Sequence, residues 1–447
     1  MLRKLFIVCA LVATLAAQSK KPKPSPAHDA AAPAAAGETI ALKGGKLLTI
    51  THGVIENGVV VMQNGRISAL GGAGTAIPAG SRIIDVTGMT VYPGLIDSET
   101  HLGLTEISAD RMTNDELENS DEIMPHMHVY DAFHAESALI PVTRINGITN
   151  AIVAPAIGDT LPGQDSFIQL AGASATEMLA VRDIAMPLNF TGRQRRNQNF
   201  DQAKFPFTRM GMATQLRQAF IDAQDYEQKL AAWEKKKSSA DEKEKEKAGA
   251  PPKRDLKLEA LLPYLQGKKP VVLAAEEPND LLTALDLARD FHLKVILNHV
   301  THSAALLDRI AATGLPVIVG PIYEQPKESE RYDVVYSIPA QLAKRGVKIA
   351  FASYDAHQAR NLPYAAGYAV GFGLPPEEAL KALTINPAQI WGVDKDLGSL
   401  EVGKLGNVVV ANGDPLDVRT DVKHVFIQGQ EIPLVSKQTQ LRDQYWK

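Results

Sequence analysis

The segment YPGLIDSETHLGL, at residues 92–104, decides the fold expected for this chain of 447 residues. A Pro-Gly pair opens it, and the residues that follow are those of a short, largely apolar strand. Residues two apart in a β-strand point to the same side, so Glu99 and His101 are expected to face the same way. At the C-terminal mouth of a barrel strand, such a pair could hold a metal ion.

The sequence patterns on the two sides of this segment differ. Short runs rich in Val, Ile and Thr precede it, and Asn64-Gly65 between two of them is a strong hairpin signal. After it, short apolar runs alternate with stretches of helical spacing, which predicts an α/β fold. We expect a distorted (β/α)₈ TIM barrel over 93–392, a length that suits this fold of typically ~250 residues.

The β-like runs return after this region, at 408–411 and 422–428. We therefore expect the two ends of the chain, 38–92 and 393–435, to pair into one small β-sandwich beside the barrel. Residues 436–447 are expected to form a tail. Within the barrel, residues 223–257 are dominated by Lys and acidic residues. They are interpreted as a solvated helical hairpin or a disordered insertion, with a docking arm for a partner as the alternative.

The composition excludes several classes of protein. The chain has 47 Lys+Arg and 51 Asp+Glu, a formal net charge of −4, and 45% hydrophobic residues. This balance is that of an ordinary globular protein and provides no basic surface for nucleic acid, so no nucleic-acid partner is expected.

The N-terminus has the features of a secretory signal peptide over residues 1–17. Arg3 and Lys4 precede an apolar run over 5–17 that ends in small residues. We expect an exported protein, periplasmic or extracellular, with no membrane attachment after cleavage; an uncleaved anchor is the alternative. Cleavage would remove Cys9, the only cysteine. Residues 18–37, rich in Lys, Pro and Ala, are expected to form an extended linker.

The motifs resemble those of the amidohydrolase superfamily, specifically its imidazolonepropionase-like hydrolases. The first barrel strand of that family normally reads PGLID-x-H-x-H, which corresponds to the segment at 93–101. EEALKALTINPA at 377–388 resembles a helix of the family, and LGSLEVGK at 397–404 resembles its return to the sandwich. The resemblance implies a metal-dependent barrel with a sandwich split around it.

The resemblance also implies which residues hold the metal. The H-x-H pair falls on Glu99 and His101, so the first His is replaced. A His of a middle strand falls on Ala274, the His of the next strand on His299, and the Asp of the last strand on Asp355. We therefore expect one divalent cation, zinc in the first place, held by His101, His299, Asp355 and Glu99.

Three protein ligands and a water are a workable set for catalytic zinc. The metal would lower the pKa of the water towards ~7. Asp355 is the expected catalytic residue, which accepts the water proton and returns it to the leaving nitrogen. The predicted activity is hydrolysis of a C–N bond in a small molecule, an amide, cyclic amide or small peptide. Asn298 and Arg331 are further candidates for polar residues that face the pocket.

Two alternatives stay open. With two implied ligands replaced, the chain could be a non-catalytic or metal-free member in which Glu99 pairs with His101. Such a protein would act as a structural or assembly partner, as a homo-oligomer or paired with a related barrel. Alternatively, His126 or His128, an H-x-H in a polar stretch after the first barrel strand, could replace a missing ligand.

Overall fold

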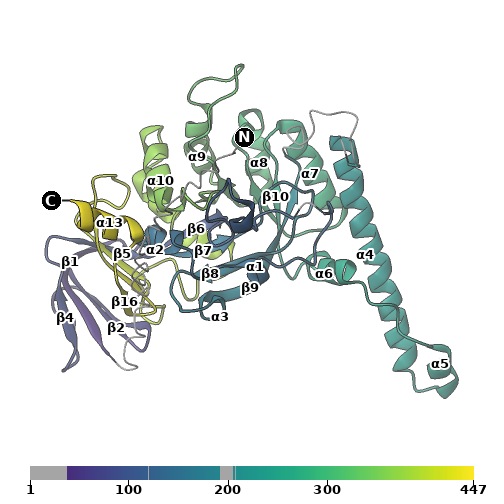
Figure 1. The fold of residues 1–447 in the computed structure, drawn as a ribbon, viewed down its shortest axis with the longest axis horizontal. Helices are drawn as coiled ribbons and strands as arrows, with labels where there is room; N and C mark the ends of the chain where they lie inside the picture. The colour runs from purple at the N-terminus through teal and green to yellow at the C-terminus, as the bar shows by residue number, and fades with distance from the viewer. Residues whose placement is uncertain (1–37, 119, 192–204, 207, 447) are drawn as a thin grey trace, which may run out of the picture.

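The computed structural model describes residues 38–118, 120–191, 205–206 and 208–446. The expected signal peptide and linker lie outside this part. An eight-stranded barrel sheet forms the centre, a second sheet lies to one side, and a long helix projects on the other (Figure 1).

The barrel sheet runs in the order β13-β12-β11-β10-β9-β8-β7-β6. Its strands are β6 (Leu95–Thr100), β7 (Ile148–Val153), β8 (Asp165–Gln169), β9 (Leu179–Asn189), β10 (Val271–Ala274), β11 (Val295–Asn298), β12 (Val317–Val319) and β13 (Ile349–Phe351). Backbone hydrogen bonds draw its two edges together, because the N–H of Tyr354, just after β13, donates to the carbonyl of Glu99 in β6 at 2.9 Å. The predicted distorted barrel is thus confirmed.

The distortion lies in the first half of the barrel. β8 runs antiparallel to both of its neighbours, β7 and β9, whereas β6 is parallel to β7 and the strands from β9 to β13 are parallel. A uniform alternation of strand and helix is therefore wrong for residues 148–189, where two antiparallel connections replace parallel crossovers.

The barrel strands are buried on both faces, which explains their nearly continuous apolar runs. In β10, Val272 belongs to an apolar cluster with Ile96 and Ile296, whereas Val271 and Leu273 belong to the cluster that includes the helices. The helices around and beside the barrel are α1 (Val129–Ala132), α2 (Leu139–Arg144), α3 (Ala175–Met178), α6 (Leu256–Leu265), α7 (Pro278–Asp290), α8 (Leu307–Thr313), α9 (Val334–Lys344), α10 (Leu362–Gly371), α11 (Pro376–Lys381) and α12 (Ile385–Ile390).

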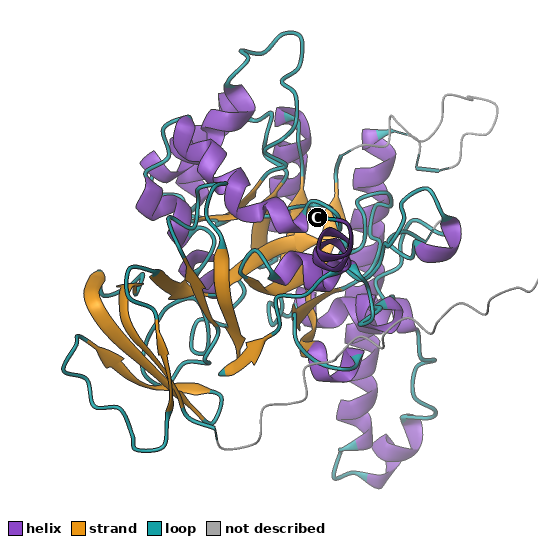
Figure 2. Cartoon of the chain, turned by 60° about the vertical axis from the view of Figure 1, so that its left-hand side comes forward, coloured by secondary structure: helices purple, strands orange, loops and turns teal. Residues whose placement is uncertain are grey.

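Both chain ends build the small β-domain, as predicted: purple and yellow strands lie together in Figure 1, and Figure 2 shows the sheet beside the rest of the structure. Its strands form one sheet, β16-β15-β14-β5-β1-β2-β3, and β4 also pairs with β1. They are β1 (Ile40–Leu48), β2 (Val54–Gln63), β3 (Arg66–Gly71), β4 (Arg82–Asp85), β5 (Thr90–Pro93), β14 (Val408–Ala411), β15 (Val422–Ile427) and β16 (Gln430–Ile432). The Asn64-Gly65 turn joins β2 to β3, and both residues have the positive φ, 51° and 78°, that a type I′ hairpin requires.

A projecting arm consists of the second half of α4 (Arg209–Lys237) and the short α5 (Glu242–Lys247) (Figure 1). The buried residues of α4 end at Tyr226, and α5 has none. A last helix, α13 (Lys437–Tyr445), follows the β-domain. Among the described residues, we find no helix with the length and apolar character needed to cross a bilayer.

Because the arm buries so little apolar surface, deleting residues 234–250 and joining the ends with a Gly-Ser linker is expected to leave the fold intact. We expect the melting temperature, followed by circular dichroism, to change by less than ~2 °C, a shift that corresponds to less than about 2 kcal/mol in a protein of this size. A fall of ~8 °C or more would show that the arm contributes to the stability of the barrel.

Candidate active site

The candidate residues lie at the C-terminal ends of three barrel strands. Glu99 is in β6, Asn298 ends β11 and His299 follows it, and Tyr354 and Asp355 follow β13. Their common position arises because the C-terminal ends of parallel strands meet at one mouth of the barrel, where the sites of such barrels lie. We call this the mouth.

Two of the four predicted ligands meet in the mouth. His299 Nε2 lies 3.8 Å from Glu99 Oε1, and each side chain is only 6% exposed. The Asn298 amide donates from Nδ2 to Glu99 Oε2 at 2.5 Å. Asn298 Oδ1 accepts from the hydroxyl of Tyr354 at 2.5 Å and from the backbone N–H of His299 at 2.9 Å. Asn298 therefore contacts both predicted ligands, the side chain of Glu99 and the backbone of His299.

His299 has an unusual backbone and an unpartnered ring. Its φ is 55°, in the left-handed region that a non-glycine residue seldom adopts, and Tyr354 has a φ of 56°. The two rings are in contact, with centroids 4.3 Å apart. Neither ring nitrogen of His299 has a hydrogen-bond partner within the described part of the chain. Burying an imidazole without partners costs stability, so its retention points to a role in function.

A second carboxyl group, that of Asp97, accepts from the backbone N–H of Glu99. Burial raises the pKa of Asp97 to about 7, and the charge of Glu99 adds to the effect, whereas hydrogen bonds from Ser353 oppose it. Ser353 donates to Asp97 from its hydroxyl at 2.6 Å and from its backbone N–H at 3.0 Å. Burial also raises the pKa of the Tyr354 phenol, which therefore stays a donor at neutral pH.

The other two predicted ligands, Asp355 and His101, each have one polar atom engaged by a backbone group outside this pair. Asp355 Oδ1 accepts from the backbone N–H groups of His357 at 2.5 Å and Gln358 at 2.8 Å, and its side chain is 47% exposed. His101 Nδ1 lies 2.9 Å from the carbonyl of Ala154. In the described structure, no hydrogen bond or ion pair joins either side chain to Glu99 or His299.

The surroundings of the remaining candidate residues show whether they can act at the mouth. Ala274 is fully buried at the end of β10, directly beside Asn298 in the strand register, so it provides no ligand atom where the resemblance expects one. His128 Nδ1 lies 2.7 Å from Asp183 Oδ1, so this nitrogen of His128 already has a partner outside the predicted ligands. Arg331 is 81% exposed and pairs with Asp333, so the expectation that it faces the pocket is wrong. Tyr354 is the contact that sequence reasoning missed.

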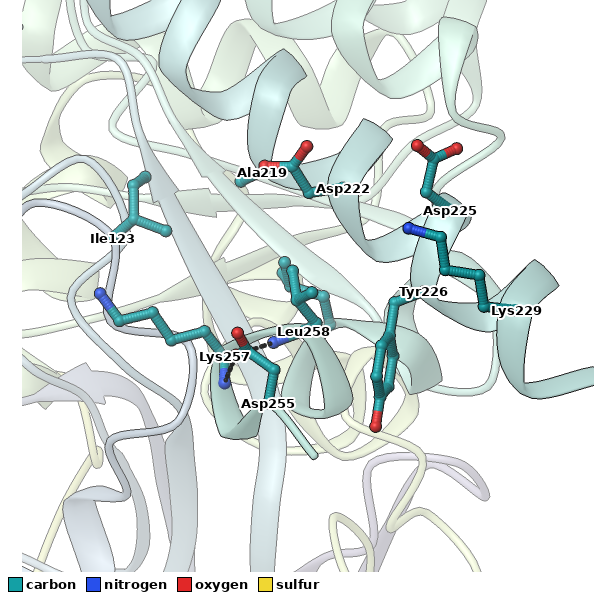
Figure 3. Close-up of a pocket in the computed structure, with 10 residues that line it drawn as sticks. Ile123, Ala219, Asp222, Asp225, Tyr226, Lys229, Asp255, Lys257 and Leu258 are labelled. Carbon is teal, nitrogen blue, oxygen red and sulfur yellow. Dashed lines mark hydrogen bonds between the residues drawn. The ribbon is translucent and has the colours of Figure 1, made fainter. Parts of the chain in front are cut away.

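One hollow outside the mouth lies in the β-domain, where Arg82 and His424 help to line it, and two more lie beside the barrel. One, of about 450 Å³, is lined by His126 and His128 together with several carboxylates of the loop after β6. The other, of about 410 Å³, lies between α4 and α6 (Figure 3). There Asp255 accepts from the backbone N–H groups of Lys257 and Leu258, so it is used as the cap of α6. Neither hollow contains the predicted ligands.

The donor atoms fit the cation that the resemblance implies only in part. Among described residues, no group of three or more His, Cys, Asp or Glu side chains is gathered closely enough to hold a metal. The chemistry of three donors is nevertheless suitable: His299 has two free nitrogens, Glu99 lies beside it, and the His101 contact with a carbonyl is the support that a metal-bound imidazole usually has. Asp355 and Ala274 do not fit.

Known proteins similar to this chain support the resemblance seen in the sequence. A profile described as the amidohydrolase family matches residues 276–432. The crystal structure of an amidohydrolase from Thermotoga maritima superposes with a TM-score of 0.80 at 27% identity, and the match covers 88% of this chain and 99% of that one. The resemblance of the chain to the amidohydrolase superfamily is thus confirmed.

Some proteins similar to this chain are much longer than it. The amidohydrolase TasK of Hapsidospora irregularis is 24% identical over 399 residues, 84% of this chain but 39% of TasK. A dihydroorotase of Geobacter sulfurreducens is 29% identical over 164 residues, 35% of this chain and 38% of that enzyme. The chain thus matches well under half the length of these two relatives. A molinate hydrolase structure, at 18% identity and a TM-score of 0.53, shares the fold.

Proposed function

We propose that the protein hydrolyses a C–N bond in a small molecule, an amide, cyclic amide or small peptide, at the mouth of the barrel. The observation that carries this proposal is the buried imidazole of His299, without a hydrogen-bond partner within the described residues and 3.8 Å from Glu99. Perturbed or unpaired polar groups in such a position are typical of sites that bind a ligand. The amidohydrolase relatives support the hydrolase class.

The proposal includes one divalent cation, zinc in the first place. Glu99, His101 and His299 are the residues that would hold it, and a bound cation would supply Lewis-acid polarisation of the substrate carbonyl. Glu99 provides oxygen, which harder cations favour more than nitrogen.

The roles of the side chains follow from their contacts. Asn298 fixes one oxygen of Glu99, and the carbonyl of Ala154 fixes the ring of His101. His299 can accept a proton or a substrate hydrogen bond at either free nitrogen. Asp355 remains the proposed proton shuttle; for this role its carboxylate must leave the N–H groups of His357 and Gln358.

A second candidate function rests on Ala274, which offers no ligand atom, and on Asp355, which is turned into its own loop. A member with a reduced site of this kind would serve as a metal-free structural partner, assembled with itself or with an intact relative. In both cases export through the signal peptide at 1–17 is part of the proposal.

The proposed function predicts metal-dependent turnover. Purified protein would be assayed with a panel of small amides, cyclic amides and dipeptides by the release of amine, after dialysis against a chelator and after zinc is added back. We expect turnover that is lost on chelation and restored by zinc. Absence of turnover over the whole panel with zinc present would favour the structural role, and turnover unaffected by chelation would contradict the cation.

A further inference from the structure

The segment between β12 and α9, residues 320–333, starts at the C-terminal end of a barrel strand, on the side of the barrel where the mouth lies. We call it the β12–α9 loop. Within the described structure, its backbone hydrogen bonds reach only the first turn of α9. Ile322 is buried and the ring of Tyr323 lies near Tyr368 of α10, but no residue from 324 to 333 is buried. The attachment of this second half to the barrel therefore depends mainly on ion pairs.

His302 is the residue to which the second half of the loop is attached. It lies between β11 and α8, and its side chain is 2% exposed. Its Nδ1 lies 2.7 Å from Glu330 Oε2, and its Nε2 lies 3.9 Å from Glu324 Oε1. Both ring nitrogens of one buried imidazole thus face carboxylates of the β12–α9 loop.

Only the protonated imidazole suits these two neighbours. An imidazolium carries an N–H on each nitrogen, whereas a neutral imidazole turns the lone pair of one nitrogen towards a carboxylate. Because the ring is shielded from water, solvent cannot relieve that contact. The pKa of His302 is accordingly raised, first by Glu324 and further by Glu330, whereas burial and the charge of Lys327 oppose the rise.

Other charged groups face this cluster from the neighbouring elements. Lys327 of the loop pairs with Glu277, which precedes α7, and Arg209 of α4 pairs with Asp280 of α7. These pairs keep their charges between about pH 6 and about pH 9, so they do not make the attachment pH-dependent in this range. His299, three residues before His302, acts on Glu324 through its charge and needs a control of its own.

We propose that protonated His302 fastens residues 324–333 to the barrel, and that loss of its proton releases them beside the mouth. The stabilisation is complete below the ordinary pKa of histidine, about 6.5, and is lost as the pH rises through the raised pKa of His302. The loop is thus held in mildly acidic solution and released in mildly alkaline solution.

The test is hydrogen–deuterium exchange of the full chain, read by mass spectrometry between about pH 6 and about pH 9 and corrected for the intrinsic exchange rate. We expect the protection of residues 324–333 to fall about 10- to 100-fold over this range, the effect of losing a hydrogen bond to a charged group. Residues 412–421, which contain no histidine, serve as the reference within the same molecule and should keep their protection. In His302→Gln, the loop should show the low protection at every pH.

His424→Gln is the matched control, because His424 Nδ1 also lies 2.6 Å from a glutamate, Glu431, but in the β-domain. It and His299→Asn should keep the wild-type profile of the loop. Glu330→Gln provides a second route if His302→Gln folds poorly, and should reduce both the protection near pH 6 and its change with pH.

Three results would overturn the proposal. The first is loop protection in the wild type that does not change with pH, whether it is high or absent. The second is a pH dependence that both His302→Gln and Glu330→Gln retain. The third is a pH dependence that His299→Asn abolishes and His302→Gln keeps, which would assign the effect to His299.

Discussion

Replacing His299 with Asn is expected to lower kcat/KM by a factor on the order of 10² to 10⁴, the range that a positioned imidazole contributes. Both ring nitrogens of this residue are buried and without hydrogen-bond partners in the described structure, so substrate or cation is their expected partner. Asn tolerates the left-handed φ of 55° and provides no imidazole. The melting temperature should change little, because Asn accommodates the backbone conformation of His299 and is likewise polar.

His292→Asn is a control for the backbone effect, because His292 has a φ of 54° and is exposed between α7 and β11. Its kcat/KM should match that of the wild type. If His299→Asn retains full activity, His299 is no part of the reacting site. If it loses activity only in proportion to a fall in folded protein, its role is structural.

Much of the fold is readable from the sequence because barrel strands buried on both faces must be apolar throughout. The runs at 270–275 and 294–298 correspond to β10 and β11. The antiparallel connections of β8 and β9 escaped prediction for a physical reason. β9 starts with exposed residues, including Arg182, and has a positive φ at Asp183, so only its second half carries the signature of a buried strand.

The candidate site was likewise predictable from the sequence only in part. Strand periodicity places Glu99 at the mouth, and the strand ends explain why His299 and Asp355 lie on the same side of the barrel. The direction of the Asp355 carboxylate depends on two backbone N–H groups in its own loop, and no side-chain pattern reports their position. The contact of Tyr354 with His299 likewise depends on two left-handed backbone conformations that neither residue type favours.

The double substitution Ala274→His/Glu99→His is expected to strengthen zinc binding on the order of 100-fold or more. Zinc-finger binding energies of roughly 10–16 kcal/mol over four ligands correspond to ~3 kcal/mol per ligand, or about 100-fold for one added nitrogen ligand. Ala274 ends β10 and is paired with Asn298 in the strand register, so an imidazole at this position would lie at the same height in the barrel as the mouth residues. His at position 99 replaces an oxygen ligand by a nitrogen.

Tighter binding to the folded protein should also raise its melting temperature in proportion to the logarithm of the zinc concentration. Ala275→His is a suitable control, because Ala275 is as deeply buried as Ala274 but belongs to the apolar cluster that includes the helices. Its zinc affinity should not exceed that of the wild type, even where the larger side chain lowers stability.

The central claim, that the mouth is a reduced form of a metal centre with its missing ligand position at Ala274, is tested most directly by one calorimetric zinc titration. The wild type and Ala274→His/Glu99→His would be compared at a single pH, each after dialysis against a chelator. We expect weak binding by the wild type and a Kd lower by on the order of 100-fold for the double variant. Equal dissociation constants for the two proteins would contradict it.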